Sequence, residues 1–315
     1  MRRRELELRA AESLGCERAA VAASGCAAVL ALTSCLAAPG RTVLMPGWIC
    51  SGVVHAVLLA GMRPALVDVD EAFLMSTAHA DMIAASTDVG LVLYAPYGGH
   101  APDMETWRDW SARHGVSLVI DLAQTPDTEV WRQAAVHSTV LVSSFRSGKP
   151  LGGAGGGVVA GGADIVEDVR TFLNGGKDDH GRKIAFGLEL HLHDGAVRAA
   201  LSALTLHGRR MDAWRTATRE ALRDAGSALP PGWRKAAVAL SRFPRLDGRG
   251  KRLHPDTTFG DRAWRRTAAD RLGPWSDPPL PRLGKLYDRV TVTKIQPHRD
   301  GGDDVTSATS EEVQT

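Results

Sequence analysis

A single lysine followed by a run of glycines is the first feature of this sequence that could do chemistry. Lys149 is the only lysine before residue 177, and it lies in the segment SSFRSGKPLGGAGGGVVAG between two apolar runs. A lysine at the end of a strand, with its amine turned into a pocket, can attack a carbonyl group and form a Schiff base. An ordinary loop lysine in a glycine-rich turn would give the same local pattern, so Lys149 alone leaves both interpretations open.

Two nucleotide-binding motifs are excluded in this stretch. A phosphate-binding loop of the form GxxxxGK[ST] needs a glycine five residues before Gly148 and a hydroxyl residue after the lysine, but Ser143 and Pro150 occupy those places. No GxGxxG opens a helix after the first predicted strand, so the dinucleotide-binding fingerprint is missing as well.

An acidic residue and a turn of small residues lie upstream, where a ligand could meet the lysine. Ser117–Ile120 is predicted to be a buried strand that ends in Asp121, and parallel sheets bind ligands at the carboxyl ends of their strands. Asp121 could equally be the N-cap of the next helix. Ser24–Ala28 joins the first strand to a helix and leaves free N–H groups at a helix N-terminus, a geometry that suits a phosphate.

The elements that must position these residues follow a repeating pattern from residue 20 to 160. Short apolar runs alternate with helical stretches, which is typical of a parallel sheet with crossover helices. The helical stretches Ala27–Leu36, Ser51–Leu59 and Met104–His114 have the spacing of right-handed βαβ units. The predicted strands are Ala20–Ala22, Thr42–Met45, Ala65–Val69, Val89–Tyr94, Ser117–Ile120, Thr139–Ser143 and Gly157–Ala160. We therefore predict an α/β fold with a large, mostly parallel, doubly wound sheet.

Four segments, taken in order, resemble the DegT/StrS aminotransferases, a fold-type I family of pyridoxal-phosphate enzymes best known for aminating nucleotide-linked keto sugars. The first segment is SGCAAVLAL, which resembles the family's phosphate turn SGTAALHLAL. The second is MPGWICSGVVHAVLLAGMRPALVDVD, which resembles P-x-x-T-x followed by G-x-x-P-V-F-V-D-V-D. The third is YAPYGGHAPDMETWRDWSARHGVSLVIDLAQ, which resembles H-x-Y-G-x-x-x-D-M…H-G-x-x-V-I-E-D-A-A-Q. The fourth is SSFRSGKPLGGAGGG, which is similar to S-F-x-x-x-K-x-L-x-x-x-G-x-G-G.

The resemblance implies a role for each matching residue. Lys149 matches the lysine that forms the Schiff base (internal aldimine) with pyridoxal 5'-phosphate, and Asp121 matches the acid that pairs with the pyridine nitrogen. Gln124 matches a glutamine near the cofactor's phenolic oxygen, and Ser144 matches a serine that binds the phosphate. The phosphate turn itself corresponds to three consecutive residues, Gly25, Cys26 and Ala27.

The chain departs from the family pattern at the position that stacks on the cofactor ring. The family places an aromatic residue four positions after a proline, and counted from Pro46 this position is Cys50, with Trp48 two residues earlier. Trp48 and Cys50 are therefore candidate pocket residues, with plain packing as the alternative.

A second departure concerns the asparagine with which family members reach a partner subunit's cofactor phosphate. His191, His193 and Asp194 occupy that region here. The H-x-H pattern has no nearby cysteine or firm third ligand, so we expect no metal site.

The compartment is predicted from the cysteines and the N-terminus. Cys16, Cys26, Cys35 and Cys50 form no CxxC pair, which favours a reduced, cytoplasmic chain over a disulfide framework or a zinc site. An uncharged stretch at residues 19–38 contains LTSC, which is similar to a lipoprotein cleavage box and leaves export as the alternative, although the acidic residues before it argue against a leader. No later segment reaches about 18 apolar residues, so no membrane span is predicted.

Composition and length bound the remaining possibilities. The chain has 315 residues, of which 44% are hydrophobic and 23% charged, as in globular proteins. Its net charge of +2 gives no global reason to expect nucleic acid or an acidic membrane as a partner. Residues 207–300, however, carry 21 lysines and arginines against 10 acidic residues.

We expect two domains of unequal size. Residues 1–170 form the large pyridoxal-phosphate-binding domain, and residues 226–300 form a small C-terminal α+β domain. Residues 171–225 supply a linker rich in glycine and histidine and one long helix, Gly195–Ala225. Residues 301–315 are predicted to be a disordered tail.

The resemblance implies a cytoplasmic homodimer that transfers an amino group from an amino acid, with glutamate as the family's usual donor, to a carbonyl acceptor. A nucleotide-linked keto sugar is the leading class of acceptor, and neither nucleic acid nor membrane is expected as a partner. The alternative is a catalytically degenerate relative that keeps the fold as a regulatory or scaffolding partner.

Overall fold

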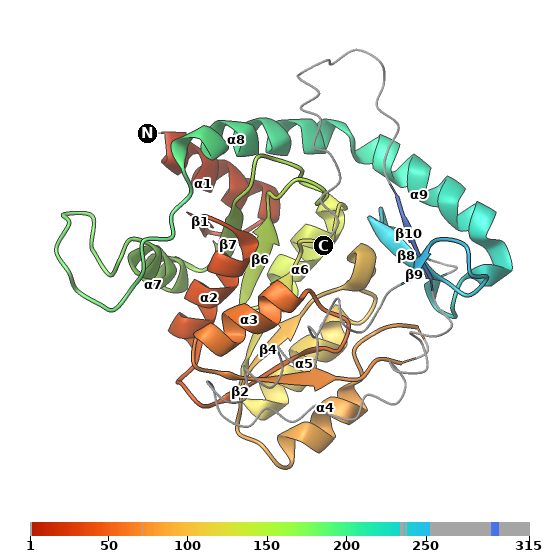
Figure 1. Ribbon diagram of the computed structural model, residues 1–315, viewed down its shortest axis with the longest axis horizontal. Helices are drawn as coiled ribbons and strands as arrows, with labels where there is room; N and C mark the ends of the chain where they lie inside the picture. Colours follow the sequence, from red (N-terminus) through yellow and green to blue (C-terminus); the bar gives the residue numbers. More distant parts are fainter. Residues whose placement is uncertain (1, 71, 234–235, 237, 253–290, 296–315) are drawn as a thin grey trace.

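A seven-stranded sheet forms the centre of the protein (Figure 1). The computed structural model describes residues 2–70, 72–233, 236, 238–252 and 291–295. The strand order is β1-β7-β6-β5-β4-β2-β3, and only β7 runs antiparallel to its neighbours within this sheet. The strands are β1 (Arg18–Ala22), β2 (Thr42–Pro46), β3 (Arg63–Val67), β4 (Val89–Tyr94), β5 (Ser117–Asp121), β6 (Val140–Ser144) and β7 (Gly157–Gly161). All seven predicted strands and the α/β class are confirmed.

Helices cover both faces of the sheet and divide its side chains between two cores. One core lies under α2, α3 and α7, and the other lies under α1, α4, α5, α6 and α8. Because both faces are covered, the central strands are continuous apolar runs, as in β4 (VGLVLY), where every residue is buried. The helices of the large sheet are α1 (Arg2–Leu14), α2 (Gly25–Leu36), α3 (Ser51–Leu59), α4 (Thr77–Ala84), α5 (Met104–His114), α6 (Thr128–His137), α7 (Ala163–Leu173) and α8 (Asp194–Arg209).

The prediction of one long helix over Gly195–Ala225 is wrong, because the chain forms two helices there. These are α8 and α9 (Met211–Ala225), and the chain leaves helical geometry at Arg210, where φ is −98° and ψ is 6°. Buried residues of α8 belong to the core under α1, whereas Met211 and Trp214 of α9 belong to the opposite core. The helix must therefore change direction between them, as Figure 1 shows.

A small antiparallel sheet follows α9 and the short 3-10 turn Gly226–Ala228. It consists of β8 (Arg242–Arg245), β10 (Thr291–Lys294) and β9 (Lys251–Arg252), in that order. Much of the predicted small domain and all of the predicted tail lie outside the described residues. Within the described part of the chain, no helix is long and apolar enough to cross a membrane.

Candidate active site

Lys149 lies in a tight turn after β6, near enough to Asp121 for their charges to affect each other. The Phe145 carbonyl accepts a hydrogen bond from Gly153 N–H (2.8 Å), and Lys149 N–H donates to the Arg146 carbonyl (3.1 Å), so the turn is fixed by its own backbone. Burial lowers the pKa of the Lys149 amine from its ordinary value, and the Asp121 carboxylate opposes this change. The structure therefore brings together the amine and the acid, which are far apart in sequence.

Asp121 is the last residue of β5, at the carboxyl end of a central strand. Its Oδ1 accepts a hydrogen bond from Ala123 N–H (2.8 Å). Burial raises the pKa of the Asp121 carboxyl group, and the charge of Lys149 opposes this change. The next helix, α6, is capped instead by Asp127, whose carboxylate accepts a hydrogen bond from Glu129 N–H (2.9 Å). Asp121 is therefore not the N-cap of α6, and its carboxyl group interacts electrostatically with Lys149.

The turn between β1 and α2 lies directly against Ser144. Ser24 caps α2 by accepting a hydrogen bond from Ala27 N–H (3.0 Å), and the amides of Gly25 and Cys26 precede it, where a helix cannot satisfy its own N–H groups. A Cβ placed on Gly25 would lie 3.2 Å from Ser144 Cβ, so a side chain there would crowd the end of β6. The residues predicted to bind a phosphate therefore lie next to one another, although the Ala27 N–H already donates to the Ser24 side chain.

Two exposed thiols lie beside this turn, one in the first turn of α2 and one at the N-cap of α3. A Cβ placed on Gly52 would lie 2.7 Å from Cys26 Sγ and 3.8 Å from Cys50 Sγ, so the two sulfurs lie within 6.5 Å of each other. Desolvation raises the pKa of the Cys26 thiol, Cys50 and Asp121 raise it further, and Lys149 is among the groups that lower it. Both cysteines therefore lie near the Lys149–Asp121 pair.

Gln124 has its side chain fixed by the backbone of a neighbouring turn. Gly98 N–H donates to Gln124 Oε1 (3.0 Å), and the Ser241 hydroxyl donates to the Gln124 carbonyl (2.6 Å). This orientation leaves the side-chain NH2 group as the donor for a ligand. Ser241 directly precedes β8, so these bonds also join the small sheet to the end of β5.

Trp48 packs in an aromatic cluster. Its ring centroid lies 5.0 Å from that of Phe73 and 4.8 Å from that of Tyr97, and only 8% of the residue is exposed. Tyr97 contacts Trp233 at 6.2 Å in an edge-on arrangement. Trp48 therefore has the packing contacts that were the alternative to a pocket role, and its contact with a ligand stays a prediction.

Two arginines that sequence reasoning did not single out act on Lys149. Arg146 and Arg242 both lower the pKa of its amine, in the same direction as the larger effect of burial. Arg242 opens β8, and its Nε is buried without a hydrogen-bond partner in the described part of the chain. A buried, unpaired guanidinium N–H costs free energy unless a ligand accepts its hydrogen bond. Arg242 is suited to an anionic group of a ligand, and the weak periodicity of its segment could not have revealed this.

The segment that stands in place of the family's asparagine leads into α8. His193 caps this helix, because its Nδ1 accepts a hydrogen bond from Gly195 N–H (3.2 Å), and Asp194 is the first helical residue. His191 forms an isolated bridge with Ala22 at the end of β1. Among the described residues, no three His, Cys, Asp or Glu side chains are arranged to hold a metal ion.

Comparison with known proteins identifies relatives over nearly the whole chain. The sequence matches the DegT/DnrJ/EryC1/StrS aminotransferase family over residues 1–247. A DegT/DnrJ/EryC1/StrS aminotransferase from Brucella abortus is 22% identical with a TM-score of 0.75, and the match covers 94% of this chain and 86% of that one. NtdA from Bacillus subtilis with bound cofactor PMP is 17% identical, with a TM-score of 0.75 and coverage of 94% and 73%. PseC from Helicobacter pylori, an aminotransferase involved in the biosynthesis of pseudoaminic acid, is 16% identical, with a TM-score of 0.70 and coverage of 94% and 85%.

The family match and the seven-stranded sheet together make this protein an aminotransferase that uses pyridoxal phosphate. More narrowly, the chain belongs to the DegT/DnrJ/EryC1/StrS aminotransferase family. Its residues fit the cofactor, because an amine faces an acid and the glycine turn leaves space beside Ser144 that a Cβ would crowd. Arg242, whose charge acts on Lys149, has a buried Nε without a hydrogen-bond partner among the described residues.

Proposed function

We propose that Lys149 holds pyridoxal phosphate covalently and that the enzyme moves an amino group from an amino acid to a carbonyl acceptor. The proximity of Lys149 and Asp121 carries the proposal, because a buried amine of lowered pKa lies within electrostatic reach of a carboxyl group at the end of a central strand. A degenerate relative with a regulatory role would not need this pair.

Each member of the pair has a task in the reaction. Bound pyridoxal phosphate supplies an electron sink when the substrate Cα–H bond breaks. Asp121, as a carboxylate, keeps a proton on the pyridine nitrogen and so keeps that sink effective. Lys149 Nζ accepts the proton from Cα and returns it, and the lowered pKa helps because more of the amine is neutral near neutral pH.

The turn at the start of α2 binds the phosphate. The amides of Gly25 and Cys26 donate to its oxygens at the positive end of the helix, and the Ser144 hydroxyl turns to it from its long bond to the Gly156 carbonyl (3.4 Å). Gln124 donates its side-chain NH2 to the phenolic oxygen, because its Oε1 is held by Gly98.

Arg242 binds the carboxylate of the amino donor. Its guanidinium lies near Lys149, is buried at Nε and has no hydrogen-bond partner for that nitrogen in the described residues. Glutamate is the proposed donor, on the family resemblance. The proposed acceptor is a nucleotide-linked keto sugar, which the likeness to PseC and its part in the biosynthesis of pseudoaminic acid supports.

We propose a cytoplasmic homodimer with a large domain at residues 1–170 and a small domain at residues 226–300. The four unpaired cysteines agree with a reducing compartment. The dimer is supported by the family's use of the segment around His191 to reach a partner's cofactor.

Absorbance spectra of the purified protein test the role of Lys149. With pyridoxal phosphate, the wild type should show a band near roughly 410–430 nm that borohydride abolishes. Lys149→Ala should lack this band, whereas Lys183→Ala, a change of an exposed lysine, should keep it. An unchanged band in Lys149→Ala would overturn the assignment.

Stopped-flow spectra with glutamate test the role of Arg242 and separate catalysis from the regulatory alternative. Glutamate should convert the wild-type cofactor to its pyridoxamine form. Arg242→Ala should keep the cofactor band but need about tenfold to a hundredfold more glutamate for half-maximal conversion, because a charge-assisted bond is lost. A wild-type protein that binds the cofactor but converts it with no amino acid would favour the regulatory role.

A further inference from the structure

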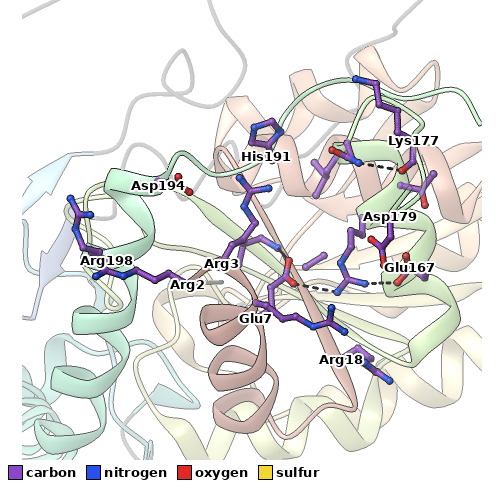
Figure 2. Close-up of a pocket in the computed structure, with 17 residues that line it drawn as sticks. Arg2, Arg3, Glu7, Arg18, Glu167, Lys177, Asp179, His191, Asp194 and Arg198 are labelled. Atoms are coloured by element: carbon purple, nitrogen blue, oxygen red, sulfur yellow. Dashed lines mark hydrogen bonds and ion pairs between the residues drawn. The ribbon is translucent and has the colours of Figure 1, made fainter. Parts of the chain in front are cut away.

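A cavity of about 720 Å³ lies away from Lys149, along the outer edge of the sheet. It is bounded by α1, β1, α7, the segment after α7 and the start of α8, and none of the predicted cofactor-binding residues lines it (Figure 2). Its volume lies in the range of small-molecule sites, roughly 300–1,000 Å³.

The backbone of the edge strand β1 is already capped within this cavity. Glu7 accepts a hydrogen bond from Val21 N–H (3.3 Å), and Arg170 donates to the Ala19 carbonyl (3.1 Å). Glu7 and Arg170 also form an ion pair at 3.4 Å. Because side chains occupy these edge groups, an added peptide strand could not pair with β1 here. The cavity is therefore suited to a small molecule rather than to an extended peptide.

The charges that line the cavity are strongly unbalanced. Seven arginine or lysine side chains face four acidic ones, and two of those acids, Glu7 and Glu167, both pair with Arg170. The other arginines of the lining, Arg2, Arg3, Arg4, Arg18 and Arg198, form no ion pair with any described residue. Figure 2 shows Arg2 and Arg198 on one side of the view and Arg18 on the other.

Arg3 adds a buried donor that lacks an acceptor. One of its terminal nitrogens donates to the Leu192 carbonyl (3.3 Å), but its Nε is buried without a hydrogen-bond partner among the described residues. Arginines that outnumber the acids around them repel one another, and a buried N–H without an acceptor costs free energy. An anion in the cavity would relieve both costs.

We propose that this cavity binds a small molecule that carries two or more phosphate groups, of the size of a nucleoside diphosphate. Guanidinium groups match phosphate oxygens in a bidentate fork. The arginines come from three separate elements, α1, β1 and α8, so a ligand that joins them needs more than one anionic group. This second site shares no lining residue with the predicted cofactor contacts of the same chain, although His191 and Asp194 belong to the segment that by family resemblance reaches toward a partner subunit.

Isothermal titration with pyrophosphate and with uridine diphosphate tests the proposal, with pyridoxal phosphate present in excess so that the phosphate turn is filled. The wild type should bind both probes, and Arg18→Ala and Arg198→Ala should each weaken binding about tenfold. Both arginines are exposed, so neither change should affect folding. Arg9→Ala is the matched control, because Arg9 lies on α1 outside the cavity and pairs with Glu5.

The proposal is overturned if neither probe binds at millimolar concentration, or if Arg9→Ala weakens binding as much as the cavity changes, since general surface charge would then explain the result. It is also overturned if citrate, a tricarboxylate, binds as tightly as pyrophosphate. Because the titration reads phosphate binding and not amino transfer, its outcome stays separate from that of the Lys149 experiment.

Discussion

Asp121 is the residue whose charge should matter most to the reaction. Asp121→Asn keeps the size of the side chain and an oxygen for the Ala123 N–H, so cofactor binding should persist. An amide cannot hold the proton on the pyridine nitrogen, and the rate of amino transfer should fall at least about a hundredfold. Steady-state kinetics and the cofactor spectrum, measured together, check this. A variant with nearly wild-type turnover would show that Asp121 does not act on the cofactor ring.

The thiols of Cys26 and Cys50 give a chemical probe of where the cofactor binds. Both are exposed, and both lie near Lys149. Alkylation at pH 8, followed by mass spectrometry, should modify them in the cofactor-free protein, Cys26 slowly because desolvation raises the pKa of its thiol, and should spare them once pyridoxal phosphate is bound. Cys16 and Cys35 serve as internal controls, because burial raises the pKa of each thiol to about 11 and keeps it protonated and slow to react. Equal labelling with and without cofactor would place the cofactor elsewhere.

Among the elements, α6, α9 and the segment before β8 are joined through Asp127, a buried carboxylate. It accepts hydrogen bonds from Glu129 N–H (2.9 Å), Ala239 N–H (2.8 Å) and the Arg215 guanidinium (3.0 and 3.2 Å). Asp127→Ala leaves these donors unsatisfied and should lower the free energy of unfolding by about 3 kcal/mol at pH 7. Asp109→Ala, at an exposed ion pair with Arg108, should cost under about 0.5 kcal/mol. Urea unfolding measures both.

The effect of Asp127 should depend on pH in a defined direction. Burial raises the pKa of its carboxyl group, but the bonds from Arg215 and the two backbone N–H groups outweigh burial and hold the pKa below its ordinary value. A group with a lowered pKa stabilises the fold above its unfolded pKa and loses that effect as the pH falls through the folded value. The difference between wild type and Asp127→Ala should therefore be full at pH 7 and shrink below about pH 4. A constant difference down to pH 3 would contradict the ionic origin.

At the level of elements, the sequence predicted the strands well and the helix junction badly, for a physical reason. A central strand covered on both faces is a continuous apolar run, so β4 was predicted to the residue. The junction at Arg210 arises because α8 packs on one core and α9 on the other. The apolar pattern of the sequence continues across this junction. Local periodicity therefore gave one helix where tertiary packing requires two.

At the scale of the whole molecule, the candidate site was predictable only where one segment carries its own pattern. Lys149 stands out in the sequence because it follows the end of a predicted strand. The turn at Gly25 stands out because its neighbours are small residues. Arg242 does not stand out in the sequence. Its strand reaches the end of β5 through the hydrogen bond between Ser241 and Gln124, which forms only in the folded chain. The gathering of arginines around the edge cavity could not be predicted either, because α1, β1 and α8 meet there only in three dimensions.

The proposed dimer can be tested at an apolar loop between α7 and α8. Ile184, Phe186 and Leu188 are 61%, 84% and 43% exposed, which is unfavourable for a solvated loop unless another chain covers it. The loop leads into the segment with which family members reach a partner subunit, so a second copy of this chain is the expected cover.

Phe186→Ser should raise the dimer dissociation constant at least about tenfold in sedimentation experiments, because one large buried ring is lost. Met82→Ser changes a residue that is 71% exposed on α4 and should leave the dimer intact. A wild-type monomer at micromolar concentration, or equal effects of the two changes, would show that this loop does not hold a second copy.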